Sequence, residues 1–457
     1  MSAIAALANP RAPLGFPLPP APADDAATRS ELEALRKTVA ELNGTVLQHL
    51  RTLHAAQERD RINERLTRIS QITPKDRRVV FIGSTGFAGN IKYAWLDFAQ
   101  RAQALGIECW FAPQTREQDA LMKTLGVNHF PVDWTTWTRE HTSAALRTAV
   151  RVIDTHYTAI ASPNPYQVAL FSGAAEVQLW HGISIKEIAL RANVGLAQMT
   201  LAHAQNLASC GDMSVFVGSS AQAEGEWRRW FAFDRYANVG YPRNDVLLRE
   251  PTELDLLNVD TAALAACRTV RSRGGKVFFY TPTYRDSGNG SWLHPEALNE
   301  AARGLARHGH LLLVNLHPLE QRHQPRLEAQ CPGVGFVAPG TDIYPLLTST
   351  DALVTDYSSL MFDYLMTQRP VLLWRPDHDA YVADSRELFD EKVRAPLGAT
   401  VTTADELVAA CVLLAEEPAE FAANRDALRA RLFDHPDSLA GERTSALIAA
   451  EVERVLA

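Results

Sequence analysis

Groups that can move a proton or hold a phosphate are concentrated in four short segments of this 457-residue chain. One segment, Leu179 to Gly182, contains His181, and the others are 240–245, 316–318 and 355–359. Together they carry imidazole, guanidinium, carboxylate and paired hydroxyl groups. An imidazole accepts a proton near neutral pH, and a guanidinium binds phosphate oxygens bidentately. This set is typical of a site for a phosphorylated nucleotide donor.

His181 and His317 each follow a short apolar run and precede a glycine or a proline. In parallel sheets, ligands bind just outside the carboxyl ends of the strands, so both histidines are predicted to face a ligand. His181 is a candidate general base, and the alternative is that it only hydrogen-bonds a loop. His317 is a second acid–base group, a positive partner for nucleotide phosphates or a structural residue.

Three further side chains are candidate phosphate contacts. Arg243 follows a Gly-Tyr-Pro turn and could grip a phosphate, or it could pair with Asp245 and close a linker. Thr283 and Arg285 follow the strand-like run 276–280, so they are predicted phosphate or acceptor contacts.

The segment 355–359, Thr-Asp-Tyr-Ser-Ser, lies between an apolar run, 352–354, and a helical run, 360–366. Ser358 or Ser359 would cap that helix. The amides and the positive end of the helix dipole would then receive a diphosphate without a metal. The alternative is simple N-capping.

Short apolar runs that alternate with amphipathic stretches of helix length must position these motifs. The pattern indicates parallel sheets covered by helices on both faces, and the chain is long enough for two. The runs are 78–83, 108–112, 159–161, 177–180, 213–217, 276–280, 311–316, 352–354 and 371–374. The sequence therefore predicts an α/β protein.

The domain organisation follows from changes in composition along the chain. Residues 1–28 are predicted to be a disordered Pro/Ala-rich tail, and 29–72 a helix. Residues 75–238 are predicted to form a first domain built on one parallel sheet. Residues 239–457 are predicted to form a second domain built on the other, with a last helix, 440–456, free to pack on either half.

Apolar residues of the first helix recur in steps of three and four from Leu32 to Val46 and, after a break in phase, from Leu50 to Ile69. Ser30 with Glu33 matches the S-x-x-E capping box and predicts the helix start. The stripe is compatible with an oligomerising coiled coil through 30–70 or with a helix docked on its own domain. Gly44 and the break in phase weigh against the coiled coil.

The composition excludes some classes of function. With 45 basic and 53 acidic residues, the net charge is −8, so a general nucleic-acid binder is excluded. The five cysteines are scattered and lack metal-ligand spacing, which predicts a reducing cytoplasm and no metal site. No signal peptide is recognisable, and no apolar run approaches the roughly 18 residues that span a bilayer. Any membrane role is therefore predicted to be peripheral.

Two other segments carry weaker signals. The loop 83–89, with Gly86, matches neither phosphate-binding glycine motif, so it is predicted to face the interdomain cleft and the acceptor. The stretch 227–235 mixes tryptophan, phenylalanine and arginine. It is either an interfacial membrane contact or a buried aromatic face with solvated arginines.

Taken in order, these segments resemble the CDP-glycerol glycerophosphotransferase family, the teichoic-acid type of polyol-phosphate primases and polymerases. The resemblance covers about 175–400, is weaker over 78–175 and excludes the tail and the first helix. The matching letters are Trp180-His181-Gly182 with Lys186, Gly240-Tyr241-Pro242-Arg243-Asn244-Asp245, Thr281-Pro282-Thr283-Tyr284-Arg285-Asp286, Leu316-His317-Pro318, Thr355-Asp356-Tyr357-Ser358-Ser359, Phe362-Asp363-Tyr364 and Arg369-Pro370-Val371.

The resemblance implies a GT-B-like architecture, in which two Rossmann-type domains face a cleft. The first, 75–238, would bind the acceptor, and the second, 239–457, would hold most of the CDP-alcohol. It implies transfer of a polyol phosphate to a hydroxyl of a growing acceptor, with release of CMP. His181 would deprotonate the attacking hydroxyl. The donor diphosphate would be held by Arg285, His317, Thr355, Ser358 and Ser359.

The predicted site thus has three groups. The catalytic candidates are His181 and His317. The donor-binding candidates are Arg243, Asn244, Asp245, Thr283, Arg285, Asp286, Pro318, Thr355, Asp356, Ser358 and Ser359. The acceptor or cleft candidates are Gly182, Lys186, Gly86 and Lys92. No metal or cofactor is expected, since the CDP-polyol is a substrate.

The chain departs from the family pattern over 381–398, where Glu391 stands at a usually aromatic position and Pro396-Leu397-Gly398 replaces Pro-Gly-Pro. The leading prediction is a bacterial, cytoplasmic glycerol-phosphate transferase, peripheral at the inner face of the cell membrane, that extends a surface or capsular polymer or a lipid-linked acceptor. The alternatives are a GT-B glycosyltransferase that uses a nucleotide sugar and a non-catalytic coiled-coil scaffold.

Overall fold

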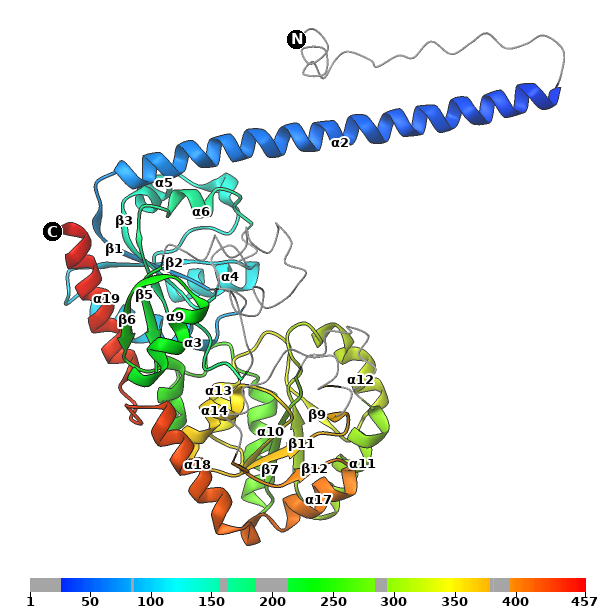
Figure 1. Cartoon of the computed structure of the whole chain (residues 1–457), viewed down its shortest axis with the longest axis vertical. Coiled ribbons are helices and arrows are strands. Elements are labelled where there is room, and N and C mark those ends of the chain that lie inside the picture. Colours follow the sequence, from blue (N-terminus) through cyan, green and yellow to red (C-terminus); the bar gives the residue numbers. More distant parts are fainter. Residues whose placement is uncertain are drawn as a thin grey trace. The chain divides into compact units, whose positions relative to one another are not determined.

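The structure is a computed structural model that describes residues 26–83, 86–155, 163–185, 213–283, 294–378, 381 and 395–457. The chain divides into two units, one ending at Ile69 and the other comprising Ser70–Ala457. Figure 1 labels the described elements. Most of the predicted Pro/Ala-rich tail, residues 1–25, lies outside the described residues.

The first unit contains most of helix α2, Ala26–Ile72. The helix begins four residues before Ser30, so the prediction that a capping box at Ser30 starts it is wrong. Gly44 does not interrupt it, because one glycine costs a helix only about 1 kcal/mol. Leu35, Leu42 and Leu53 expose 57%, 59% and 59% of their surface. No helix in the described residues has the length and apolarity needed to cross a bilayer.

The first sheet has the order β2-β1-β3-β4-β5-β6 in the described chain, and neighbouring strands pair in parallel. Its strands are β1 Asp76–Ile82, β2 Glu108–Ala112, β3 Thr148–Ile153, β4 Ala175–Gln178, β5 Met213–Gly218 and β6 Phe233–Asn238. Its helices are α3 Gly89–Ala102, α4 Arg116–Leu125, α5 Arg139–Leu146, α6 Gln167–Leu170 and α9 Glu224–Trp230. Val79 to Ile82 are fully buried, as expected of a central parallel strand.

Two strands of this sheet were not predicted. β3 contains Arg151, which interrupts an apolar run but is buried in an ion pair with Glu176 (3.0 Å). β6 contains Asp234 and Arg235 and is partly exposed, as an edge strand can be. The predicted run 159–161 lies outside the described residues.

The second sheet has the order β12-β11-β10-β7-β8-β9 in the part that the structure describes, again with parallel pairing. Its strands are β7 Val277–Thr281, β8 Leu311–Val314, β9 Gly335–Phe336, β10 Ala352–Thr355, β11 Val371–Trp374 and β12 Thr400–Val401. Its helices are α10 Thr261–Ser272, α11 Pro295–Arg307, α12 Gln324–Gln330, α13 Tyr344–Leu347, α14 Leu360–Tyr364, α17 Ala404–Val412 and α18 Ala419–Leu432. The prediction of an α/β protein with two parallel sheets is confirmed.

The chain passes between the two sheets twice. The 3₁₀ segment η4, Pro242–Leu248, follows the first sheet, and the chain returns before helix α19, Ala440–Leu456. α19 packs against α3 and against β1 and β3 of the first sheet (Figure 1). The Ser445 hydroxyl donates to the Asp97 carboxylate of α3 (2.7 Å). One hydrophobic cluster includes residues of both sheets, among them Val79 and Leu353. The half of the chain built on the first sheet and the half built on the second therefore share a core.

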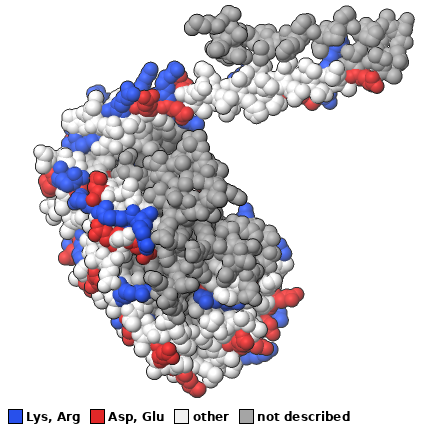
Figure 2. Space-filling model, viewed as in Figure 1, with Lys and Arg blue, Asp and Glu red and all other residues white. Residues whose placement is uncertain are grey.

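Charged side chains are mixed in sign on the face that Figure 2 shows. Arg101 of α3 pairs with Glu442 (2.9 Å), and Arg77 pairs with Glu453 (2.6 Å), which ties α19 to the first sheet. Such exposed pairs contribute little stability each.

Candidate active site

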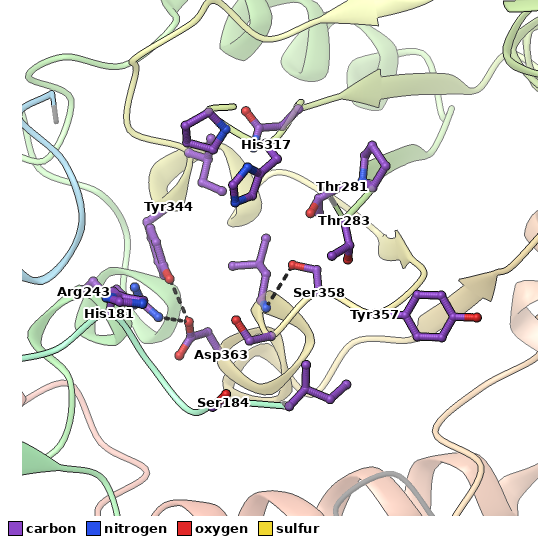
Figure 3. A pocket seen from close by; sticks show the side chains of 17 residues that line it. His181, Ser184, Arg243, Thr281, Thr283, His317, Tyr344, Tyr357, Ser358 and Asp363 are labelled. Atoms are coloured by element: carbon purple, nitrogen blue, oxygen red, sulfur yellow. Dashed lines mark hydrogen bonds and ion pairs between the residues drawn. The ribbon is translucent and has the colours of Figure 1, made fainter. Parts of the chain in front are cut away.

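A cavity of about 360 Å³ lies between the carboxyl ends of strands from both sheets (Figure 3). The first half contributes the turn after β4, and η4 contributes Arg243. The second half contributes the ends of β7 and β8, the start of α13 and the β10–α14 turn. Its lining therefore brings together six segments that are far apart in the sequence, as expected for ligand sites in parallel sheets. The predicted residues in the lining are His181, Arg243, Thr283, His317, Pro318, Ser358 and Ser359.

His181 is presented by a turn with unusual backbone geometry. Trp180 has φ +51°, and Gly182 has φ +109°. The Trp180 side chain is buried among Phe216, Trp227 and Phe231, which anchors the turn. A Cβ at residue 182 would collide with the Arg243 guanidinium, so only glycine fits there.

The backbone selects the tautomer of His181. Its Nδ1 lies 3.2 Å from the carbonyl oxygen of Asp154. A carbonyl oxygen only accepts, so Nδ1 must carry a proton, and the neutral imidazole then has its lone pair on Nε2. His181 is also exposed, and its ring lies against that of Trp180 in a tilted arrangement, with 4.1 Å between ring centroids. The ring is thus held in the tautomer that a general base at Nε2 requires.

His317 has the opposite arrangement. Its Nδ1 accepts a hydrogen bond from the backbone N–H of Leu319 (3.3 Å). Since a backbone N–H only donates, the neutral ring carries its proton on Nε2. The two imidazoles therefore differ chemically, because one offers a lone pair at Nε2 and the other a proton.

The guanidinium of Arg243 already has a partner within the protein. The guanidinium pairs with the buried carboxylate of Asp363, which also accepts a bond from the Tyr344 hydroxyl (2.7 Å) (Figure 3). Burial alone would lower the pKa of Arg243, but the Asp363 carboxylate holds that pKa above its ordinary value. Burial also raises the pKa of Tyr344 well above its usual value, so its hydroxyl keeps the proton that it donates. Arg243 thus lines the cavity with its charge offset, which argues against the predicted bidentate grip on a phosphate.

Asn244 and Asp245, two predicted donor contacts, lie outside the described lining of the cavity. The Asp245 carboxylate accepts the backbone N–H groups of Ala440 (3.0 Å) and Gly441 (2.8 Å) at the start of α19. Asn244 is buried, and neither its side-chain nitrogen nor its oxygen has a hydrogen-bond partner among the described residues. Asp245 thus joins η4 to the start of α19, the two places where the chain passes from one sheet to the other. It does not pair with Arg243, whose partner is Asp363.

Thr355 and Asp356 connect strand ends. The Thr355 hydroxyl donates to the carbonyl of Thr281 (2.8 Å), and Asp356 accepts from the Thr283 amide (2.9 Å) and hydroxyl (2.6 Å). Both residues are buried and outside the described cavity lining. They hold the β7 and β10 turns together and leave Thr283 at the cavity.

Ser358 caps α14 by accepting the Leu360 amide (3.3 Å), and Ser359, the residue before the helix, makes no side-chain cap bond. α14 has only five residues, so its dipole is smaller than that of the predicted helix over 360–366.

Lys92 and Gly86, two predicted cleft residues, make contacts between the halves. The fully buried Lys92 ammonium bonds Asp342 (2.7 Å) and the carbonyls of Asp255 (2.6 Å) and Leu257 (2.7 Å). A Cβ at residue 86 would lie 2.6 Å from the carbonyl oxygen of Gly340. Neither residue is in the described cavity lining.

Several predictions concern residues outside the described ranges, namely Lys186, Arg285, Asp286 and most of 381–398. Within the described ranges, no group of three or more His, Cys, Asp or Glu side chains converges as a metal site. The aromatic residues Trp227, Trp230, Phe231 and Phe233 are buried, while Arg228 stacks on Phe233 and pairs with Glu224. The stretch 227–235 is therefore a buried aromatic face, and the predicted membrane contact through its aromatic residues is wrong.

The sequence interpretation missed Asp154, Tyr344 and Asp363 as site residues. Asp154 acts through its backbone carbonyl, for which no side-chain pattern exists. Tyr344 lies in an apolar stretch without a motif, and Asp363 had a signal only as part of the family-like Phe-Asp-Tyr triplet.

Comparisons with known proteins identify relatives of this chain. The family described as CDP-Glycerol:Poly(glycerophosphate) glycerophosphotransferase matches residues 67–450. A teichoic acid poly(glycerol phosphate) polymerase of Bacillus spizizenii is 24% identical over 51% of this chain, and the match spans 60% of that relative. A teichoic acid glycerol-phosphate transferase of Staphylococcus aureus is 26% identical over 58% of this chain and 69% of its own length.

Among solved structures, the wall teichoic acid polymerase TagF superposes with a TM-score of 0.65 at 19% identity. The superposition covers 93% of this chain and 98% of that one. The predicted GT-B-like fold is thereby confirmed.

Proposed function

Because the chain belongs to the CDP-glycerol:poly(glycerophosphate) glycerophosphotransferase family, we propose that it transfers a polyol phosphate from a CDP-polyol to a hydroxyl of a surface-polymer or lipid-linked acceptor. Glycerol phosphate is the first candidate, since two relatives are named for glycerol phosphate. The acceptor oxygen bonds to the phosphorus that carries the polyol. The bond from that phosphorus to the bridging oxygen breaks, and CMP leaves with the electron pair.

The observation that carries the proposal is the meeting of two histidines with opposite tautomers in one cavity. In the proposed step, Nε2 of His181 takes the proton of the acceptor hydroxyl. Its Nδ1–H stays bonded to the Asp154 carbonyl, which stabilises the imidazolium that forms. A general base of this kind contributes about 10²- to 10⁴-fold in rate.

His317 is proposed to act on the donor. Its Nε2–H would donate to a phosphate oxygen and offset the charge that develops on the leaving CMP. The hydroxyls of Ser358, Ser359 and Thr283 line the same cavity and would orient the diphosphate. Arg285, as a further cationic contact, remains part of the proposal on the basis of the family resemblance. No cofactor enters the proposed reaction.

The test is a donor screen. The protein is incubated with CDP-glycerol, CDP-ribitol and a panel of nucleotide sugars, each with a primed acceptor, and release of labelled nucleotide is measured. We expect CMP release from a CDP-polyol that depends on the acceptor. Turnover of nucleotide sugars alone would support a GT-B glycosyltransferase, and absence of turnover with every donor would support a scaffold.

We also propose an oligomeric state and a cellular location for the protein. The exposed stripe of Leu35, Leu42, Val46 and Leu53 on α2 supports association of two copies through 30–70. A polymer or lipid-linked acceptor supports a cytoplasmic location, peripheral at the inner face of the cell membrane. Since the aromatic residues of 227–235 are buried, that contact would use another surface.

A further inference from the structure

Asn90 lies in the first turn of α3 and is completely buried, outside the described lining of the cavity. Its side-chain nitrogen donates to the carbonyl oxygen of Trp180 (2.9 Å) and, at 3.4 Å, to that of Leu179. Its side-chain oxygen accepts the backbone N–H of Arg243 (3.3 Å). A buried amide is costly unless it is bonded. These bonds make Asn90 a connector between the turn of His181 and the segment of Arg243.

The turn of His181 needs such support. A φ of +51° at Trp180 lies in the left-handed region, which is unfavourable for a residue with a bulky side chain. The peptide units beside Trp180 are held from both sides, because its N–H donates to the side-chain oxygen of Gln178 (2.9 Å) and its carbonyl accepts from Asn90. Strained backbone persists only where the surroundings over-determine it.

The same turn of α3 also holds the partner of the His181 ring. The backbone N–H of Ile91 donates to the Asp154 carboxylate (3.3 Å), and the Asp154 carbonyl is the group that faces His181 Nδ1. Adjacent residues of α3 therefore fix the backbone that carries the imidazole and the residue that selects its tautomer.

We infer that Asn90 is a positioning residue for the base: its side-chain amide keeps His181 in the orientation and tautomer that place the lone pair on Nε2. Asn90 itself does not touch substrate. The inference rests on the proposed function for the role of His181, but its structural part, the control of the His181 tautomer, does not depend on activity.

The test compares Asn90→Ala with Asn258→Ala. Asn258 is a matched control because its side-chain nitrogen also bonds two backbone carbonyls, those of Phe87 (3.1 Å) and Gly340 (3.0 Å), and also joins the halves. Among the described residues, the Asn258 side chain makes no hydrogen bond to the turn of His181. Two readouts are taken on the full chain: steady-state CMP release, normalised to the number of CDP-glycerol sites measured by calorimetry, and ¹⁵N chemical shifts of labelled histidine side chains, with His181 assigned from a His181→Gln spectrum.

For Asn90→Ala we expect kcat per binding site to fall by about 10²-fold, the loss typical of a misplaced catalytic group, while KM for CDP-glycerol stays within about threefold. The His181 ¹⁵N signals should move from the Nδ1–H pattern toward an average of both tautomers. Asn258→Ala should keep the wild-type kcat and the wild-type His181 signals.

Unchanged His181 signals in folded Asn90→Ala protein would overturn the inference, and so would an equal fall in kcat for Asn258→Ala. If Asn90→Ala does not fold, Asn90→Asp decides by the same readouts, since it keeps the acceptor for Arg243 and loses the donor to Trp180. If the wild type turns over no donor, the proposed function fails, and the ¹⁵N signals still decide whether Asn90 sets the His181 tautomer.

Discussion

The two cavity histidines show how a single backbone contact assigns a chemical role. Nδ1 of His181 meets a carbonyl, and Nδ1 of His317 meets an N–H, so identical side chains carry their mobile protons on opposite nitrogens. Neither contact involves another side chain, so the roles are set by where each ring lies against the main chain. Arg243 shows the converse, because a side chain able to bind phosphate is occupied by Asp363.

The division of roles predicts different responses to the same substitution. His181→Gln should lower kcat by about 10²- to 10⁴-fold and leave donor affinity nearly unchanged, because the amide cannot take a proton. His317→Gln should weaken donor binding. It should lower kcat less than His181→Gln does, because the amide still donates a hydrogen bond. Steady-state CMP release and calorimetry with CDP-glycerol measure the two effects. Loss of donor binding in His181→Gln, with intact binding in His317→Gln, would reverse the assignment.

Helix α3 is the element that joins the site to the rest of the fold. Its first turn bonds the His181 turn through Asn90, and the next turn buries Lys92 against Asp342 of the second half. Asp342 also accepts the Tyr93 hydroxyl (2.7 Å) and the Tyr344 amide (3.2 Å), and Tyr344 contacts the Asp363 pair at the cavity. One helix start thereby contacts both sides of the cavity.

Lys92→Met is predicted to destabilise the fold strongly. The substitution leaves the Asp342 carboxylate buried without its cation, which costs about 3 to 5 kcal/mol in free energy of unfolding. Adding Asp342→Asn should restore part of that loss, because the uncompensated charge is removed. Urea unfolding of Lys92→Met, Asp342→Asn, the double variant and the wild type gives the comparison. A double variant that is less stable than Lys92→Met by the full cost of Asp342→Asn alone would show that the pair is not coupled.

The contact between η4 and α19 is predicted to depend on pH. Burial raises the pKa of Asp245 to about 6 from 3.8, although the amides of Gly441 and Ala440 oppose the shift. Between these values the folded protein holds a proton that the unfolded chain has released. The stability from this group is therefore fully present below about pH 4 and lost as pH rises through about 6, and the total is roughly 3 kcal/mol.

Asp245→Asn should remove this decline, so its urea midpoint should change less than that of the wild type between about pH 4 and about pH 7. Asp434→Asn is a control of opposite sign. The Ala221 amide lowers the pKa of Asp434, so its contribution is present above the unfolded pKa and lost as pH falls. Parallel midpoint curves for Asp245→Asn and the wild type would contradict the assignment.

At the scale of the whole molecule, the chain combines a compact unit, Ser70–Ala457, that contains both sheets and the cavity, with a long helix that begins outside that unit. The boundary at Ser70 has a physical basis, since the buried Ser70 hydroxyl donates to the Leu170 carbonyl (2.8 Å) and accepts the Gly173 amide (3.0 Å). A truncation intended to keep the unit Ser70–Ala457 intact must therefore retain Ser70.

Removal of residues 1–69 is predicted to convert a dimer to a monomer and to preserve CMP release per chain with a soluble acceptor. Multi-angle light scattering measures the mass. Leu42→Asp should have the same effect on mass because it puts a charge in the apolar stripe, whereas Gln48→Asp, on the opposite side of the helix, should leave the dimer intact. A full-length monomer, or a dimer that survives truncation, would count against association through α2.

The amino-acid pattern alone predicts the alternation of strands and helices, the two parallel sheets and the placement of His181, His317, Thr283 and Ser358 at strand ends. These follow from local patterns, because periodicity and turn residues act over a few positions. β3 was not predicted, because Arg151 interrupts its apolar run and the residue that neutralises Arg151 is Glu176, which lies on another strand.

The three-dimensional fold is needed to show which polar residues line the cavity and which hold the two halves together. Arg243, Asp245, Asp356 and Lys92 look alike in sequence as charged residues near turns, but their partners are Asp363, the α19 amides, Thr283 and Asp342. The tautomers of the two histidines were decided in the same way. Each outcome depends on a group distant in sequence or on a main-chain atom, and burial gives those contacts their energy.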